Sequence, residues 1–294
     1  MTHADVRPSN RAALAEFVRA CRERLTPEAV GLQRIGRRRT PGLRREEVAQ
    51  LSGISIAYYS WLEQGRAIHM SHDMLSALAR TLRLNEAERA YLLLLAGDAP
   101  LDAVEEAQPS MHPVLETIFH TSDLVAAVKF DQWFNVIAAT PLAAAVFGLP
   151  GPEAAFNLLD AIFADSPYRA LWDEVEAEQL LMTAMFRMTL ARWADDLEGE
   201  ARLARLCTVP EFEKLWRTYE VRCRPAPKEY FRREPWRLRH PAVGVLEMHR
   251  LAFSVPTALH REIVVYSAAD EETFSRLERL ARVSGQLSDR DQLS

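Results

Sequence analysis

Arginines gather in one acid-free stretch near the start of the chain, and a further arginine, Arg66, follows it. The twelve-residue stretch contains Arg34, Arg37, Arg38, Arg39, Arg44 and Arg45. A guanidinium carries a planar fork of N–H donors that suits phosphate oxygens better than an ammonium group does. The chemistry indicated is the binding of a phosphate polyanion, although the same side chains could also do no more than solvate a loop.

The net charge of −5 conceals an uneven distribution along the chain. Residues 1–97 hold fifteen Arg, no Lys and ten Asp or Glu, which amounts to +5, so the remainder carries −10. A basic first third joined to an acidic remainder predicts two modules with different partners. The first module is a candidate for binding nucleic acid.

The overall composition excludes several classes of protein. Hydrophobic residues make up 48% and charged residues 26%, which is typical of a globular chain and not of a disordered, collagenous or coiled-coil one. No apolar run approaches the ~20 residues that a membrane span needs, and residues 1–11 lack a signal-peptide pattern, so no membrane partner is expected. The widely spaced Cys21, Cys207 and Cys223 favour the reducing cytoplasm over a disulfide framework or a structural zinc.

The elements that must position the arginines are two helices joined by a tight turn, predicted from the pattern of residues 45–64. Ala49 supplies the small residue that a steep helix crossing needs, and Gly53 suits the positive φ of the turn. Ser55 is a natural N-cap for the second helix. The positions that must face inward are apolar: Val48, Ile54, Tyr59 and Leu62.

Helical periodicity covers the rest of the first module. The predicted helices span residues 10–25, 44–51, 55–64, 71–82 and a segment that starts after Asn85. Ser71 and Asn85 are expected N-caps, and Gly65 suits the left-handed position after a helix. Residues 98–112, rich in proline and acid, are predicted to be a linker.

The second module is predicted to be α+β, with strands at its two ends and helices between them. The expected elements are strands at 125–130 and 134–138, helices over 156–219, strands at 243–248, 250–255 and 262–267, and a helix at 273–283. The domain prediction is therefore 1–97 for DNA binding, 98–112 for the linker, 113–284 for the second domain and 285–294 for a tail.

Both modules resemble known families. The segments RRRTPGLRREEVAQLSGIS, YYSWLEQGR and LSALARTLRLNEAERAYLLLLAG are similar to the DNA-binding domain of the phage-repressor and Cro type, the XRE family. The segments FNVIAATPLAAAVFG, NLLDAIF, PEFEKLW, HPAVGVLEM and IVVYSA resemble the PAS-like domain of the branch named after the MmyB regulator. The resemblance implies a multidomain chain, in which an all-α five-helix Cro/repressor-type domain precedes an α+β PAS-like domain. Ala139-Thr140 departs from it, because the family usually has Trp-Asn or a similar pair there.

Domains of the Cro/repressor type bind double-stranded DNA with the second helix of the pair in the major groove. The outward residues expected to contact bases are Ser55, Ile56, Ala57, Tyr58 and Trp61. Ser55 and Tyr58 offer single hydrogen bonds, whereas Ile56 and Ala57 suit thymine methyl groups. Trp61 could contact DNA or pack over the fourth helix. The predicted phosphate contacts are Arg37, Arg38, Arg39, Arg44, Arg45 and Arg66.

Three residues of the same helix are predicted to be structural. Tyr59 and Leu62 belong to the core, and Glu63 is expected to accept hydrogen bonds from backbone or arginine groups, since a carboxylate facing phosphate would repel it. The recognition helix of one chain contacts only a few base pairs. The protein is therefore expected to bind DNA as a homodimer.

The search for catalytic chemistry finds no HExxH, GxSxG, GxGxxG or Walker A motif. His69 and His72 are three residues apart but have no third ligand nearby in sequence. Cys207 and Cys223 are expected to be buried thiols. The sequence therefore predicts no catalytic residues, no metal, no cofactor and no enzyme.

The stretch 180–193 is apolar over more than one helical face, and it must bury both faces. It could fill an ordinary core or a dimer seam, or it could surround a ligand to which its methionines adapt. The resemblance to the MmyB-like family implies a fatty-acid-like ligand. The predicted cavity is lined by Val128, Phe130, Val136, Phe163, Met182, Phe186, Trp193 and Trp216.

The leading hypothesis is a cytoplasmic, sequence-specific transcription regulator whose C-terminal domain senses a small apolar, fatty-acid-like ligand. A second hypothesis is a DNA-binding regulator whose C-terminal domain only dimerises and binds no small molecule. A third is an enzyme fused to a DNA-binding domain. The basic stretch 222–239 could contact DNA, bind an anionic head group or form a solvated loop, and the loop is favoured.

Overall fold

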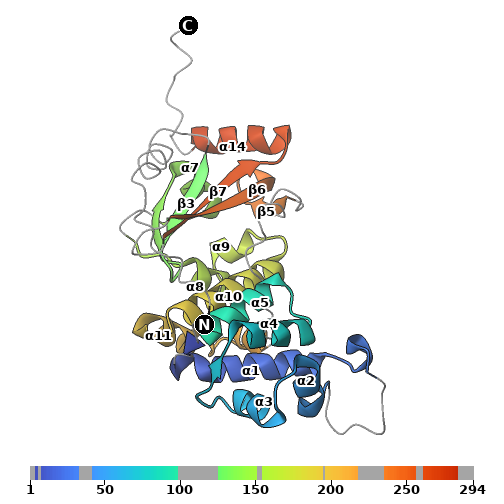
Figure 1. Cartoon of the computed structure of the whole chain (residues 1–294). Coiled ribbons are helices and arrows are strands. Elements are labelled where there is room, and N and C mark those ends of the chain that lie inside the picture. Colours follow the sequence, from blue (N-terminus) through green and yellow to red (C-terminus); the bar gives the residue numbers. More distant parts are fainter. Residues whose placement is uncertain are drawn as a thin grey trace. The chain divides into compact units, whose positions relative to one another are not determined.

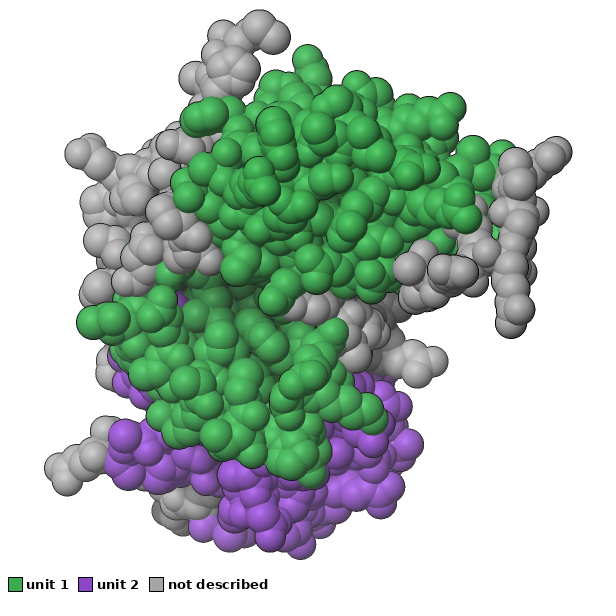
Figure 2. Space-filling view, turned by 90° about the horizontal axis from the view of Figure 1, so that it is seen from below, with its two compact units in different colours: residues 1–100, 183–224 green, residues 101–182, 225–294 purple. Residues whose placement is uncertain are grey.

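The computed structural model describes residues 4–5, 8–32, 42–98, 125–150, 154–194, 196–217, 235–255 and 261–283. The chain divides into two compact units, which Figure 2 shows in different colours: unit 1 comprises residues 1–100 and 183–224, and unit 2 comprises 101–182 and 225–294. The predicted linker lies mostly outside the described residues. Residues 183–224, which the sequence assigned to the second domain, belong to unit 1. Over the described ranges, none of the helices has the length and apolar character that a membrane crossing requires.

Unit 1 contains the predicted helical module (Figure 1). Its elements up to residue 98 are β1 (Ala4–Asp5), α1 (Pro8–Arg24), a 3-10 turn (Glu28–Val30), α2 (Arg45–Ser52), α3 (Ile56–Glu63), β2 (His69–Met70), α4 (His72–Thr81) and α5 (Glu86–Ala96). The two short strands pair antiparallel. The helix boundaries agree with the sequence prediction to within a few residues.

Local signals set the helix starts and the turn. The side chains of Ser55, Ser71 and Asn85 each accept a hydrogen bond from the backbone N–H three residues on, at 3.2, 3.3 and 2.9 Å. Such caps satisfy N–H groups that have no partner within the helix. Gly53 has a φ of 71°, as the turn between α2 and α3 requires. All three predicted caps and the predicted turn residue are therefore confirmed.

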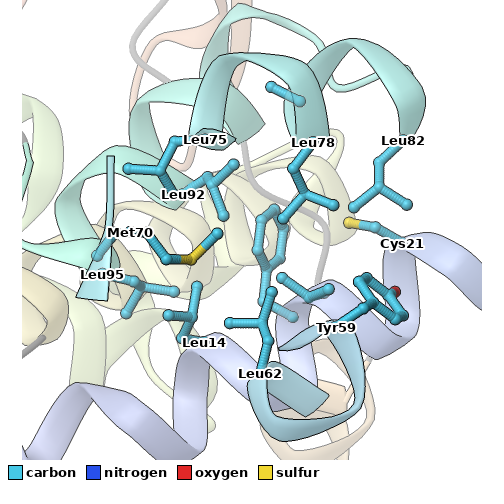
Figure 3. Close-up of a cluster of buried hydrophobic side chains, with 14 of the residues drawn as sticks. Leu14, Cys21, Tyr59, Leu62, Met70, Leu75, Leu78, Leu82, Leu92 and Leu95 are labelled. Carbon is cyan, nitrogen blue, oxygen red and sulfur yellow. The ribbon is translucent and has the colours of Figure 1, made fainter. Parts of the chain in front are cut away.

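One apolar core holds these helices together, and Figure 3 shows part of it. Leu14 of α1, Tyr59 and Leu62 of α3, and Leu75 of α4 are all at most 2% exposed. Phe17 of α1 meets Tyr91 of α5 edge-to-face, with ring centroids 5.0 Å apart. Burying each side chain of this size contributes roughly 1.5–3 kcal/mol. The predicted core positions of α2 and α3 are thus confirmed.

Unit 1 also includes the end of α10 (Val175–Arg192), together with α11 (Leu197–Leu206) and α12 (Pro210–Arg217). Ala191 belongs to the same core as α1 to α5, and Met188 packs against that core. Leu181 and Met182, earlier in α10, are buried in unit 2. The two halves of this helix thus belong to different units.

Unit 2 is built on a five-stranded antiparallel sheet with the strand order β4-β3-β7-β6-β5. The strands are β3 (Ala126–Phe130), β4 (Val136–Ala139), β5 (Trp236–His240), β6 (Gly244–Val255) and β7 (Arg261–Ala268). Its described helices are α7 (Pro141–Phe147), α8 (Leu158–Phe163), α9 (Pro167–Ala170), the start of α10, and α14 (Glu271–Val283). The predicted α+β arrangement, with strands at both ends, is confirmed.

Three details of the sequence prediction were wrong. The second strand begins at Val136, because the Asp131 carboxylate accepts hydrogen bonds from the N–H groups of Trp133 and Asn135, both at 2.9 Å, and Phe134 takes a φ of 68°. The runs 243–248 and 250–255 form one strand, β6. Residues 236–239, read as part of a basic loop, form β5, which pairs with β6.

The approach of Gly42 to the end of α1 yields a stability test. A Cβ on Gly42 would lie 2.4 Å from the Glu23 carbonyl oxygen, and its φ is 75°, whereas a Cβ on Gly31, with φ 81°, would meet open space. Gly31→Ala should therefore lower the free energy of unfolding by only about 1 kcal/mol, which is the cost of placing an alanine in the left-handed backbone conformation. Gly42→Ala adds a backbone clash and should cost about 3 kcal/mol. Urea denaturation measures both losses, and equal losses would contradict the packing of residue 42 against α1.

Candidate nucleic-acid interface

The outer face of α3 is unusually apolar. Ile56 is 48% exposed and Trp61 is 42% exposed, while Ser55 and Ala57 are also exposed. Such side chains offer contacts to thymine methyl groups and to sugars in place of bidentate hydrogen bonds. Four of the five predicted base-contacting residues are thus exposed. The exposure of Trp61 leaves much of its ring available to a ligand.

Tyr58 is placed differently from the other four. It is half-buried, and its hydroxyl donates a hydrogen bond to the backbone carbonyl of His69 in β2. The hydroxyl proton is therefore used within the domain in this structure, and the single hydrogen bond predicted between Tyr58 and a base stays a prediction. Its backbone N–H, in turn, is held by the Ser55 cap. Tyr58 ties α3 to β2.

The described arginines predicted to bind phosphate are Arg44, Arg45 and Arg66, and all three are exposed. The backbone N–H of Arg44 is donated to the Glu47 carboxylate at 2.7 Å, so only its guanidinium is offered outward. Arg45 is half exposed and donates Nε–H to Glu63 at 2.7 Å. The predicted contacts Arg37, Arg38 and Arg39 lie outside the described residues.

Glu63, the last residue of α3, is the centre of a buried ion-pair network. Its side chain is fully buried and lies 2.5 Å from Nε of Arg22 in α1. Arg45 at the start of α2 pairs with its second oxygen, and Arg19 donates to its backbone carbonyl at 2.9 Å. Arg22 also donates to the carbonyl of Leu43 at 2.9 Å. One carboxylate therefore joins three helices, which extends the structural role predicted for it.

The arginines determine the charge state of this carboxylate. Burial alone would raise the pKa of Glu63, but hydrogen bonds from Arg22 and Arg45 outweigh burial and hold the pKa below the ordinary value of 4.5. Burial also raises the pKa of the neighbouring Tyr59 hydroxyl well above its ordinary value. A buried carboxylate is tolerated only with such partners. The carboxylate of Glu63 is thus charged at neutral pH.

Sequence reasoning did not single out Arg22, although a signal was present. Arg22 follows Val18 by four residues, on the apolar stripe of the first helix that also contains Cys21. A charged side chain on a buried stripe needs a buried partner of opposite charge. That partner is Glu63, the one acid of the predicted recognition helix.

The residues predicted to line a ligand cavity divide between the two units. Those in unit 2 are Val128, Phe130, Val136, Phe163 and Met182, all buried except the half-buried Val136. Phe186, Trp193 and Trp216 belong to unit 1. There Phe186 and Trp216 lie with ring centroids 6.1 Å apart, beside Phe212. The predicted set is therefore divided between the two units.

Unit 2 contains a buried ion pair that sequence reasoning missed. Arg250 of β6 and Glu178 of α10 approach to 3.0 Å, with side chains 9% and 1% exposed. The Arg250 guanidinium also lies 4.1 Å above the ring of Trp236. Strand alternation places Arg250 on the same face as the buried Leu246 and Met248, which is the signal that could have revealed it. The pair ties α10 to the sheet.

Comparison with known families gives two matches. The family model described as a helix-turn-helix domain matches residues 13–92, from Ala13 in α1 to Leu92 in α5. The family model described as the MmyB-like transcription regulator ligand binding domain matches residues 111–280. A comparison with curated proteins found no match.

The α2–turn–α3 geometry, the exposed face of α3 and the flanking arginines define a helix-turn-helix DNA-binding protein. Because the second match covers more than half of the residues, the chain belongs to the family of MmyB-like transcription regulators. It is thus a DNA-binding transcription regulator that carries a ligand-binding domain.

The Glu63 network yields an acid-dependent stability test. Glu63→Gln leaves the buried Arg22 without its counter-charge, so the free energy of unfolding at neutral pH should fall by about 3 kcal/mol. Glu23→Gln is the matched control, because the Glu23 side chain is 43% exposed and also pairs with Arg22; it should cost under about 1 kcal/mol.

The effect of pH on this difference has a definite sign. A carboxylate whose pKa is lowered by folding contributes stability above its unfolded pKa, and this stability is lost as the pH falls through the folded pKa. The gap between wild type and Glu63→Gln should therefore shrink as the pH falls below 4.5, the ordinary value for Glu. A gap independent of pH, measured by urea denaturation, would refute the charged network.

Proposed function

We propose that the protein recognises its operator through the outer face of α3. Ser55, Ile56, Ala57 and Trp61 contact base edges in the major groove, while Arg44, Arg45 and Arg66 contact the flanking phosphates. The single observation that carries the proposal is that α3 combines an exposed apolar face with an inner face locked through Glu63. Arg45 has two roles, because its Nε–H holds Glu63 while its half-exposed guanidinium faces solvent.

Substitutions of the proposed phosphate contacts and of the proposed base contacts should have different effects on DNA binding. Arg44→Ala and Arg66→Ala should each weaken binding to operator and unrelated duplexes alike, and lower the slope of log K against log salt by about 0.9. Ile56→Ala and Trp61→Ala should instead change the preference among duplexes and leave that slope unchanged. Fluorescence anisotropy over a salt series measures both quantities.

The matched control for the arginines is Arg89→Ala, at an exposed position on α5. It should alter neither the affinity nor the slope. If Arg44→Ala changed base preference with an unaltered salt slope, the assignment of phosphate contacts would be wrong.

We also propose finer features of fold and assembly. A Cro/repressor-type fold for α1 to α5 is supported by the order of the helices and their caps. A PAS-like fold for unit 2 is supported by the antiparallel sheet interrupted by helices.

A homodimer is supported by the small number of base pairs that one α3 can contact. Sedimentation of the operator complex tests it, and one chain per duplex would contradict it. DNA as the partner supports action in the cytoplasm.

We propose that the ligand-binding domain senses a small apolar, fatty-acid-like molecule. The support is the family match over residues 111–280 together with the buried apolar side chains of Phe130, Phe163 and Met182 in unit 2. A ligand that binds only the folded state stabilises it by RT ln(1 + [L]/Kd), about 2.7 kcal/mol at a hundredfold excess over Kd. The rival hypothesis is a domain that only dimerises.

A thermal-shift panel separates these hypotheses. Tetradecanoate should raise the melting temperature of the full chain, whereas the short polar acid succinate should not. Phe163→Ala should reduce the shift, and Phe274→Ala, at a 46% exposed position on α14, should leave it unchanged. No shift with any apolar compound, and no bound mass in native mass spectra, would favour the dimer-only domain.

We propose finally that the protein acts by binding and not by catalysis. Burial raises the pKa of the Cys21 thiol to about 12, so this cysteine is protonated and a poor nucleophile. Burial raises the pKa of Cys207 as well. Recovery of a chemically altered compound after incubation with the protein would contradict this proposal.

A further inference from the structure

The end of α10 is built into the DNA-binding helices, although it belongs to the matched ligand-binding region. Asn10, near the start of α1, is 4% exposed and donates its side-chain N–H to the carbonyl oxygen of Ala191 at 3.0 Å. Ala191 is one of the last residues of α10, where carbonyls lack a donor within the helix. The side chain of α1 therefore completes the hydrogen bonding at the end of α10.

A buried cation provides a second link between these elements. Arg187 of α10 is 2% exposed, and its guanidinium lies 4.0 Å from the ring centroid of Trp216 in α12. It also donates to the backbone carbonyl of Trp216. Burial raises the pKa of the Tyr91 hydroxyl in α5 to about 12, and Arg187, through its charge and a side-chain hydrogen bond, lowers the pKa of that group. Arg187 thus joins α5, α10 and α12 within unit 1.

The contacts continue from α1 to the recognition helix. Asn10 and Arg22 stand on the same 17-residue helix, and Arg22 holds Glu63 at the end of α3. A close-packed interior has low compressibility and transmits a displacement between the side chains that pack in it. A shift of α10 at Ala191 therefore acts on the helix that positions α3. Neither Asn10 nor Arg187 is among the proposed DNA contacts.

The first half of α10 is tied into unit 2. Glu178 pairs with Arg250 of the sheet, and Gln179 donates to the carbonyl of Ile162 in α8 at 3.1 Å. The same helix therefore contributes to the core of each unit. Glu178 and Gln179 stand about two helical turns before Arg187 on α10.

We propose that the end of α10, with α11 and α12, is the regulatory input to the DNA-binding helices, and that Asn10 and Arg187 are the positioning residues through which it sets α3. The inference rests on the proposed function, in which the ligand-binding domain controls DNA binding. A coupling of this kind changes affinity through the population of two arrangements and adds no contact to DNA.

The test uses the full chain and a duplex selected by the wild-type protein from a random pool. Asn10→Ala and Arg187→Met should each weaken binding to this duplex by roughly fivefold or more, within the usual range of coupling between sites. The slope of log K against log salt should stay at the wild-type value, because no phosphate contact is removed. Amide hydrogen exchange in α3 should become faster.

Thr140→Val is the control for a general loss of stability. Thr140 is fully buried in unit 2, where its hydroxyl accepts from the Ala127 and Ala143 N–H groups. This variant should melt at a lower temperature and keep the wild-type affinity for the duplex. Circular dichroism establishes that each variant is folded, and Asn10→Ala alone decides the matter if Arg187→Met does not fold.

The ligand arm of the experiment separates the inference from the proposed function. Tetradecanoate should change the affinity of the wild-type protein for the duplex. The ratio of the affinities with and without tetradecanoate should be closer to one in Asn10→Ala. If tetradecanoate has no effect on wild type while the variants bind weakly, the proposed ligand response fails and the positioning role stands. Wild-type affinity and wild-type α3 exchange in both variants would overturn the inference.

Discussion

A buried carboxylate is the constraint on which the DNA-binding surface depends. Glu63 ends α3, the proposed recognition helix, and it can be charged in the interior only because Arg22 and Arg45 donate to it. Those arginines come from α1 and α2, so the cost of leaving any partner unpaired fixes three helices at once. The exposed face of α3 is the consequence, since the opposite face is committed to the network and to the apolar core.

The position of α1 connects this network to the remainder of the chain. Near one end it holds Ala191 of α10 through Asn10, and near the other it holds Glu63 through Arg22. The compact unit that contains the DNA-binding helices is therefore not a single continuous segment of the sequence. Residues 183–217 follow the first part of the ligand-binding region in the chain and belong to the same unit as the helix-turn-helix, whose core includes Ala191.

The helical half of the fold could be predicted because its signals are local. Ser55, Ser71 and Asn85 cap helices within three residues of themselves, and Gly53 makes its turn without long-range help. The apolar stripe of α3 likewise identified the exposed residues of the candidate interface. Each of these features depends on spacing within one turn or one helix.

Features that depend on distant partners could not be read in the same way. The second apolar face of α10 required burial, but the pattern of residues 180–193 does not indicate that α1 packs against it. β5 resembled a loop, because its arginines mask a pairing with β6. Tyr58 faces outward in a helical projection, yet its hydroxyl meets His69, which lies beyond the next turn of chain.

The most direct test of the account is photocrosslinking from the bases of the operator. Duplexes in which single thymines carry iodine in place of the methyl group would be irradiated with the full chain, and the attached peptides identified by mass spectrometry. The account predicts attachment within α3, with Trp61 as the principal site, because its ring lies on the face that meets the bases. Crosslinks confined to residues outside 42–66 would contradict recognition by this helix.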